Sequence, residues 1–275
     1  MSAETQSVTS APAARRRWPR LSFPIRYRLW LVFWLALVVF FFSGLQLSLG
    51  PLQIRTIALD WEFVGKWWQF ISRGVLTTIS LAFFAIIGAT VLALVSALAR
   101  LTPVASISSL AGLYISLFRG TPLFLQMFIV YFGLAQVGLV LDGFTAAVVV
   151  LSLNYGAYMS EIFRAGIEAV SHGQVEAAYA LGMTPAQTMR RIVLPQAVRI
   201  ITPDIGNQFI AMQKDTALAS AITVTELAGR ARQAGSPNNR FFEALIVAAL
   251  WYWLLTLIFS FFQERLERRM ARSDR

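Results

Sequence analysis

The stretch EAAYALGMTPAQTMRRIVLP, residues 176–195, decides how the rest of this chain is interpreted. It contains two short helical patterns with an elbow between them. Residues 174–181 are rich in alanine, a strong helix former with almost no side-chain bulk. Gly182 follows at a place where helices commonly end in a left-handed residue. The first helix is therefore predicted to stop at Gly182.

A second helix is predicted directly after the elbow. Thr184 suits the N-cap, Pro185 suits the first helical position, and Gln187 stands three residues after the cap, as a capping box requires. This helix should end near Leu194, because the residue before Pro195 is disfavoured in helical geometry. On these signals alone, the pair could equally be an amphipathic hairpin that packs only on its own protein.

The composition is that of a membrane protein. Of 275 residues, 57% are hydrophobic and only 14% are charged. The net charge of +10 comes from arginines at both ends and in loops flanking apolar runs, which favours retention of these loops in the cytoplasm over nucleic-acid binding. No cysteine and a single histidine are present, so we expect no disulfide, no metal site and no cofactor.

The apolar runs predict an all-α integral membrane protein with about six transmembrane helices. A helix of about 20 residues crosses about 30 Å of hydrocarbon. The predicted spans are residues 29–49, 74–99, 104–138 with a break, 144–170, 200–224 and 241–262.

The segments around these spans complete the predicted organisation. Residues 1–28 are expected to form a disordered basic N-terminus, and the extra first helix with its tryptophan-rich outer segment occupies residues 29–73. The main membrane domain follows over residues 74–265, with a loop at residues 171–199 and a basic tail at residues 266–275.

The arginines before the first span place the N-terminus in the cytoplasm. With six spans, the C-terminus and residues 171–199 are then also in the cytoplasm. A signal peptide is the alternative for the first run, but that run is longer than the usual signal-peptide core. The outer loop, residues 226–240, contradicts a simple positive-inside count through Arg230, Arg232 and Arg240. Either these arginines contact a receptor outside, or the orientation is reversed; we keep the orientation because the other basic segments agree with it.

Polar residues inside the apolar runs are candidates for a solute path, because such groups are costly in lipid unless they face protein or water. For Lys214 and Asp215, each taken singly, helix packing is the simpler interpretation. For Arg119, a break that lines a path and an arginine held near the cytoplasmic interface are equally open. For Glu161 we favour an ion pair with Arg164 that clamps its helix to the loop at residues 171–199. Lys214 and Asp215 diverge by about 100° on a helix, so both reach one ligand only through an unwound turn. The candidates are Arg119, Thr121, Asn154, Glu161, Gln213, Lys214, Asp215 and Thr216.

The stretch at residues 176–195 also carries a spaced pattern: Glu-Ala-Ala, three residues, glycine, nine residues, then isoleucine, any residue, leucine and proline. This pattern resembles the signature loop of permease subunits of ATP-binding cassette importers. Ser171 departs from the family, which often has proline there. The seven matching positions are Glu176, Ala177, Ala178, Gly182, Ile192, Leu194 and Pro195. We call residues 171–199 the coupling loop, because in that family the loop lies in a groove of a separate ATPase subunit.

Three further segments resemble the polar amino acid uptake subfamily. They are RGTP at residues 119–122, LNYGAYMSEIFRAG at 153–166 and KDTAL at 214–218, where alanine replaces a frequent serine. The resemblance covers about residues 74–265 and implies a type I importer fold with a five-helix core. It implies alternating access, with an ATPase subunit, a second permease copy or paralogue and an extracytoplasmic solute-binding protein as partners.

The chain is therefore expected to be a transport subunit in the inner membrane and not an enzyme. No phosphate-binding Gly-x-x-x-x-Gly-Lys-Ser/Thr motif occurs, so ATP hydrolysis is expected on another polypeptide. The substrate class, polar L-amino acids, follows only from the resemblance. The alternatives are a permease for another small solute, an ion-coupled secondary carrier, and a membrane enzyme, for which the chain offers few catalytic groups.

Overall fold

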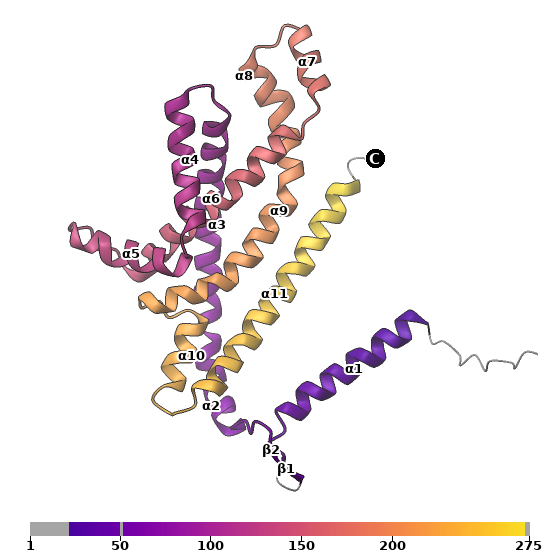
Figure 1. Ribbon diagram of the computed structural model, residues 1–275, viewed down its shortest axis with the longest axis vertical. Coiled ribbons are helices and arrows are strands. Elements are labelled where there is room, and N and C mark those ends of the chain that lie inside the picture. Colours follow the sequence, from indigo (N-terminus) through magenta and orange to yellow (C-terminus); the bar gives the residue numbers. More distant parts are fainter. Residues whose placement is uncertain (1–21, 50–51, 273–275) are drawn as a thin grey trace, which may run out of the picture. The chain divides into compact units, whose positions relative to one another are not determined.

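The computed structural model describes residues 22–49 and 52–272 (Figure 1). The chain divides into two compact units, Met1–Asp60 and Trp61–Arg275. The predicted disorder of residues 1–28 lies outside the described residues as far as residue 21. From Phe23 onward the chain is helical, so the prediction is wrong for residues 23–28.

The first unit contains one helix and one hairpin. Helix α1 (Phe23–Phe41) has a proline in its first turn and no buried residue. Strands β1 (Gln46–Leu49) and β2 (Leu52–Arg55) pair antiparallel, with Gln46 opposite Arg55. The predicted first span, residues 29–49, thus ends about eight residues early. Apolar and polar residues alternate on both sides of residues 50–51, which is the period of a strand.

The second unit is helical throughout its described residues. Its elements are α2 (Trp61–Ser72), α3 (Gly74–Leu101), α4 (Ala105–Gly120), α5 (Leu123–Gln136), α6 (Gly143–Glu168), α7 (His172–Ala180), α8 (Pro185–Thr188), the π-helical turn η1 (Met189–Val193), α9 (Leu194–Asp215), the 3₁₀ helix η2 (Thr216–Ile222), α10 (Leu227–Gly235) and α11 (Phe241–Arg272). Apart from the small hairpin in the first unit, the predicted all-α fold class is confirmed.

Four helical segments of the described chain are long and apolar enough to cross a membrane: α1, α2 with α3, α6 and α11. A fifth span results if α4 and α5, bent by 110° relative to each other, are counted as one. The predicted break at residues 119–122 lies at this bend. The fifth predicted span, residues 200–224, corresponds largely to α9, which has 22 residues but too many polar side chains to be recognised by apolarity.

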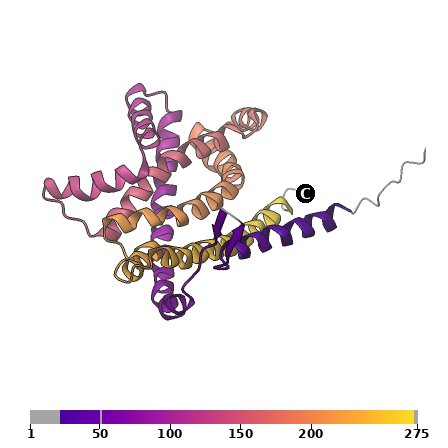
Figure 2. The same ribbon diagram turned by 60° about the horizontal axis from the view of Figure 1, so that its bottom comes forward.

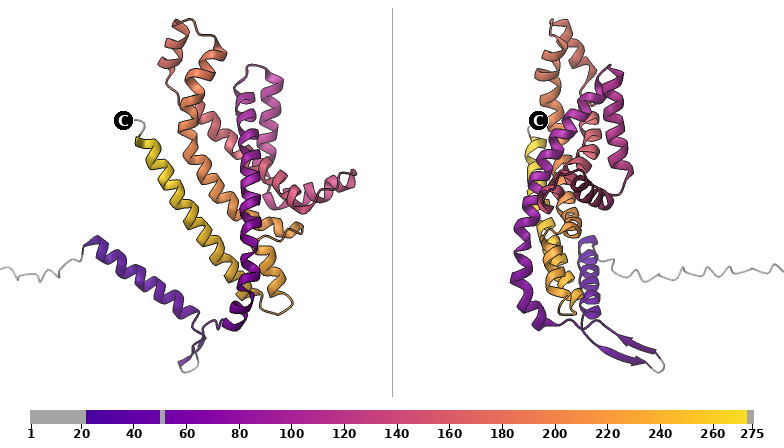
Figure 3. Two further views of the ribbon diagram at one scale, coloured as in Figure 1. Left: turned by 180° about the vertical axis from the view of Figure 1, so that it is seen from behind. Right: turned by 90° about the vertical axis from the view of Figure 1, so that its left-hand side faces the viewer.

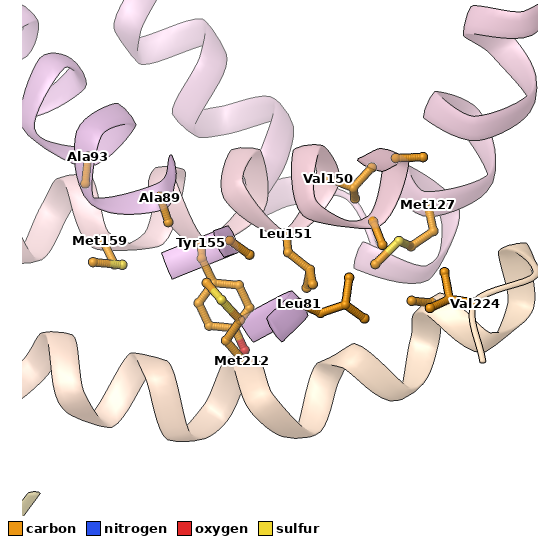
Figure 4. Packing of buried hydrophobic residues seen from close by; sticks show 14 of the residues in the cluster. Leu81, Ala89, Ala93, Met127, Val150, Leu151, Tyr155, Met159, Met212 and Val224 are labelled. Carbon is orange, nitrogen blue, oxygen red and sulfur yellow. The ribbon is translucent and has the colours of Figure 1, made fainter. Parts of the chain in front are cut away.

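Helices α3 and α6 pack closely because small residues face each other. Four alanines of α3, each four residues after the last, have no exposed surface, and Ser152 of α6 donates a hydrogen bond to the Ala85 carbonyl at 3.2 Å. A Cβ atom on Gly156 of α6 would lie 2.8 Å from the Leu92 Cβ and from the Tyr114 hydroxyl. Small residues of this kind let helix backbones approach in a membrane. Figure 4 shows Ala89 and Ala93 of α3 beside Leu151, Tyr155 and Met159 of α6.

The second unit has two distinct ends. The turn between α3 and α4, helices α7 and α8, and the C-terminal end of α11 lie at one end, whereas α2 and α10 lie at the other (Figures 1 and 3). Helix α5 leads away from the other helices at its far end (Figure 2). Both arginine-rich segments, at residues 190–199 and 265–272, are therefore on one side, as the predicted topology requires.

The packing of α3 against α6 predicts that a larger side chain at Gly156 destabilises the protein. Gly156→Leu should lower the free energy of unfolding by about 1–3 kcal/mol, because the added atoms overlap Leu92 and Tyr114. Gly133→Ala on α5, where an added Cβ meets nothing within 4 Å, is the control. The measurement is the thermal unfolding midpoint of the purified chain in detergent, and equal midpoints for both variants would contradict this packing.

Candidate functional site

The coupling loop begins with a helix that ends as predicted. The amide of Gly182, at φ +76°, donates to the Tyr179 carbonyl at 2.9 Å, and the Met183 amide donates to the Ala178 carbonyl at 3.1 Å. This pair of bonds is a Schellman motif, which satisfies carbonyls at a helix C-terminus. The first helix therefore stops at the glycine because only a residue without a Cβ adopts this conformation at low cost.

The second helix of the coupling loop starts with the predicted capping box. The Thr184 hydroxyl accepts from the Gln187 amide at 3.3 Å, and the Gln187 side chain accepts from the Thr184 amide at 2.9 Å. Two backbone donors that α8 would otherwise leave free are thereby satisfied. The elbow between α7 and α8 is fixed at both sides by local hydrogen bonds.

The predicted end of this helix near Leu194 is wrong. Leu194 has helical angles, φ −59° and ψ −43°, and its amide donates to the Met189 carbonyl, the five-residue spacing of a π helix. Pro195 follows as the second residue of α9, inside a helical run that continues from α8 through η1. The side chain of Gln196 donates to the Ile192 carbonyl at 2.9 Å. The wider π turn thus carries the chain past the proline without breaking the helix.

The coupling loop is anchored on its inner side and open on its outer side. Val193 and Ala197 are buried against Ile167 and Val170, at the C-terminal end of α6. Of the seven motif residues, Ala178 is buried, Ile192 and Leu194 are partly buried, and Glu176, Ala177, Gly182 and Pro195 are exposed. Two large apolar side chains also face outward beside the elbow: Tyr179 is 49% exposed and Leu181 is 83% exposed. The outer side of the coupling loop therefore exposes small, apolar and acidic groups.

A pocket lies at the break between α4 and α5. Its volume is about 470 Å³, and α6 and α9 complete its wall. It is lined by Arg119, Gly120, Thr121, Pro122, Leu123, Asn154, Tyr155, Tyr158, Gln208 and Asp215. Four of the eight predicted path residues, Arg119, Thr121, Asn154 and Asp215, are thus brought together from three separate segments.

The side chain of Gln126 forms hydrogen bonds with the backbone at the break between α4 and α5. It is 5% exposed, and its side-chain nitrogen lies 2.9 Å from the Phe118 carbonyl and 3.1 Å from the Thr121 carbonyl. Its side-chain oxygen accepts from Asn154 at 3.0 Å, and Asn154 also donates to the Phe118 carbonyl at 3.2 Å. Pro122 cannot continue the helical hydrogen-bond ladder, so the carbonyls at the end of α4 need other donors. Two side-chain amides supply them.

Groups of opposite charge stand in this pocket. The Asp215 carboxylate accepts a hydrogen bond from the Tyr155 hydroxyl at 2.7 Å. The guanidinium of Arg119 lies over the ring of Tyr158, 5.4 Å from its centroid, which is the geometry of a cation–π contact. Asp215 is the last residue of α9, where the chain changes to the 3₁₀ helix η2. The pocket therefore offers one cation and one anion with fixed side-chain partners.

The other four predicted path residues lie elsewhere. Lys214 is exposed and does not line the pocket, as the divergence of neighbours on a helix predicts. Gln213 and Thr216 are fully buried; the Thr216 hydroxyl donates to the Gln213 carbonyl at 2.8 Å, whereas the Gln213 side-chain amide has no partner among the described residues. Glu161 does not line the pocket either.

The predicted ion pair of Glu161 is confirmed, but its predicted role as a clamp is wrong. Arg164 bridges Glu161 at 2.8 Å and Glu168 at 2.7 Å, and all three residues belong to α6. The pair is half-exposed, and helix-surface pairs of this kind contribute only about 0.3–0.5 kcal/mol each. The described contacts that hold the coupling loop to α6 are apolar.

Six pocket residues were absent from the predicted set, and three of them carry polar side-chain groups: Tyr155, Tyr158 and Gln208. Gln126, behind the pocket wall, was also missed, although it is the only polar side chain between Leu123 and Val130. A lone amide in an apolar helix marks a buried hydrogen-bond network and was the available signal. Nothing in the sequence indicated which face of α6 would meet the break.

The predicted outer loop, residues 226–240, is mostly the helix α10. Glu226 is its N-cap, is fully buried, and accepts from the Gly229 amide at 2.7 Å and from the Tyr252 hydroxyl. Burial raises the pKa of this carboxyl. The predicted outer arginines also have neighbours: Arg230 lies over the Phe70 ring at 5.2 Å, and Arg232 donates to Ser220 at 2.8 Å.

The family comparison identifies a group of transport proteins. Residues 89–272 match the family described as binding-protein-dependent transport system inner membrane component. The L-cystine transport system permease protein TcyB of Bacillus subtilis is 41% identical over 82% of this chain and 97% of its own length. The arginine transport system permease protein ArtQ of the same organism is 42% identical over 74% of this chain and 94% of its own length.

Solved structures share the fold. A crystal structure of an amino acid ABC transporter with histidines matches with a TM-score of 0.72 and 39% identity, covering 78% of this chain and all of that chain. An inward-facing MetNI methionine ABC transporter matches with a TM-score of 0.64 over 74% of this chain and 98% of that chain. Its 21% identity supports similarity of fold alone.

The hydrogen bonds of Gln126 predict that its replacement destabilises the helix break. Gln126→Leu leaves the carbonyls of Phe118 and Thr121 short of donors and should cost about 1–3 kcal/mol of unfolding free energy. Gln136→Leu, the same change at the exposed end of α5, should leave stability nearly unchanged. Thermal unfolding in detergent measures both, and an unchanged midpoint for Gln126→Leu would refute this role.

Proposed function

Because this chain belongs to the family of binding-protein-dependent transport system inner membrane components, we propose that it forms the path by which an ATP-driven importer carries polar amino acids. It is a membrane-embedded permease subunit of an amino acid transporter. The observation that carries the substrate class is the pocket at the helix break, which sets Arg119 and Asp215 around one space.

The pocket suits a zwitterion. An amino acid has a carboxylate and an ammonium group. A guanidinium can bind the carboxylate through two parallel hydrogen bonds, and a protein carboxylate can accept hydrogen bonds from the ammonium. A pocket of about 470 Å³ is within the size range of small-molecule sites. Irregular backbone at membrane depth persists where it is buried in protein or lines a cavity, which supports the break as part of the path. The side chain of the transported amino acid is not specified by these groups.

The coupling loop is proposed to receive movement from a separate ATPase subunit. Its exposed face combines small residues, which permit close approach, with Tyr179 and Leu181 as apolar contacts. Helix α9 connects this face directly to Asp215, because it runs from Leu194 to Asp215 as one helix. Displacement of the coupling loop would thus move one wall of the pocket.

The remaining partners follow from the same proposal. A second permease copy or paralogue would complete the path, and an extracytoplasmic solute-binding protein would deliver the amino acid. The chain would lie in the inner membrane with both termini in the cytoplasm, so that the ATPase meets the coupling loop and the end of α11 on one side (Figure 3).

Changes at the exposed coupling residues should separate ATP hydrolysis from uptake. Glu176→Lys reverses an exposed charge, and Gly182→Pro cannot adopt φ +76°, so both alter the face offered to the ATPase while leaving the spans intact. His172→Lys, exposed on the same helix, is the control. Amino acid uptake and ATP hydrolysis are measured in proteoliposomes that contain the chain, its ATPase and its solute-binding protein. We expect uptake per ATP to fall about tenfold for a coupling loss of about 1.4 kcal/mol.

Normal uptake in Glu176→Lys and Gly182→Pro would contradict the coupling role. Uptake by the chain without any ATPase, driven by an ion gradient, would favour a secondary carrier instead. Co-purification of a nucleotide-binding subunit with the wild-type chain distinguishes these two classes before any transport assay.

The charge of Asp215 should matter for transport and that of Asp204 should not. Asp215→Asn removes the negative charge of the proposed acceptor for the ammonium, worth about 1.5–3 kcal/mol, so uptake at low substrate concentration should fall about 10- to 150-fold. Asp204→Asn makes the same change at an exposed position on the same helix. Radiolabelled amino acid uptake measures both variants, and equal loss in the two would exclude a specific role for the pocket carboxylate.

A further inference from the structure

The last helix ends in a basic stripe that the proposed transport path does not use. Phe261, Glu264, Arg265, Arg268 and Arg269 line a groove of about 390 Å³ at the C-terminal end of α11. These positions recur every three to four residues, so they share one face of the helix. The C-terminal end of α11, which carries these residues, lies at the same end of the second unit as α7 and α8 of the coupling loop (Figure 1).

The opposite face of this part of α11 packs against α9. Gln263 is 8% exposed and donates to the Pro203 carbonyl of α9 at 2.8 Å. Its side-chain nitrogen also lies 2.8 Å from the Glu267 carboxylate, four residues on. Glu267 is therefore turned toward α9 with Gln263, and its charge is not available to the basic stripe on the other side.

The basic stripe keeps an excess of positive charge. Arg268 pairs with Glu264 at 3.4 Å, with both side chains exposed, so this contact is weak. Arg265 and Arg269 are exposed, and no acidic partner is found for either among the described residues. Of the three arginines in the basic stripe, Arg265 and Arg269 can therefore bind an external anion through their guanidinium groups.

The same helix presents an apolar surface immediately before the stripe. Phe261 is 58% exposed and Phe262 is 60% exposed, and Leu257 and Ile258 one turn earlier are 49% and 41% exposed. An apolar side chain, Phe261, also lines the groove itself. The groove therefore joins a surface suited to acyl chains with one suited to a phosphate, which is the chemistry of a phospholipid at the boundary of the bilayer.

We propose that this groove binds the headgroup of an anionic phospholipid, with Arg265 and Arg269 on the phosphate and Phe261 against the acyl chains. Guanidinium groups bind phosphate through paired hydrogen bonds, and basic residues next to a spanning helix are attracted to anionic lipid. A bound lipid of this kind would hold the end of α11 at a fixed depth. Because Gln263 joins α11 to α9, it would also restrain the helix that links the coupling loop to the pocket.

The test measures lipid retention by the full-length chain in detergent, using native mass spectrometry with added phosphatidylglycerol or phosphatidylcholine. The wild-type chain should retain phosphatidylglycerol in preference to phosphatidylcholine. Each arginine near an anionic surface contributes about fivefold in affinity, so Arg265→Gln or Arg269→Gln should lower this preference about fivefold and the double variant about 25-fold. Glu264→Gln, which removes the neighbouring negative charge, should raise it.

Two control variants distinguish a specific lipid site from a general effect of positive charge and from misfolding. Lys66→Gln on α2 removes one exposed positive charge at the other end of the unit and should leave the preference unchanged. Arg269→Lys keeps the charge and should retain most of the preference, which shows that loss in Arg269→Gln is not misfolding. An unchanged preference in the double glutamine variant would overturn the proposal. So would displacement of the lipid by an equal concentration of inorganic phosphate, which would indicate a site for the free anion.

Discussion

A backbone group in the interior of a membrane protein must find its hydrogen-bond partner within the protein. This constraint explains the place where the chain departs from a straight helix. Between α4 and α5 a proline ends the ladder, and the amides of Gln126 and Asn154 take over the carbonyls that α4 leaves free. Buried amides with complete partners stabilise one geometry, whereas partly satisfied ones would cost several kcal/mol. The bend is thus a defined structure, and it creates the pocket.

The sequence predicted features that depend on neighbours in the chain. The helix end at Gly182 and the capping box at Thr184 were both predicted from the sequence, because each is formed by residues within a few positions of one another. The break at residues 119–122 followed from glycine and proline alone. The β hairpin was not predicted. Its residues alternate with a period of two, but the apolar character of residues 29–49 favoured a longer helix.

Features that depend on packing could not be read in this way. Leu194 remained helical, with its amide bonded across a π turn to the Met189 carbonyl, and no local rule indicated that turn. The ion pair of Glu161 with Arg164 was predicted from their spacing on one helix, but the contact of Asp215 with Tyr155, 60 residues away in the chain, was not. The direction in which each helix turns its polar face is set by close contacts such as those of Gly156. These contacts join residues far apart in the sequence.

The π turn at Met189–Val193 also sets the rotational phase of α9. A π turn holds one more residue than an α-helical turn, and one residue corresponds to about 100° around a helix axis. Every side chain from Leu194 to Asp215 is therefore displaced around the axis relative to an uninterrupted continuation of α8. Asp215 lines the pocket in a helix that carries this offset. Loss of a single residue in the turn would leave composition and hydropathy almost unchanged, yet it would rotate the Asp215 carboxylate by about 100° relative to the coupling loop.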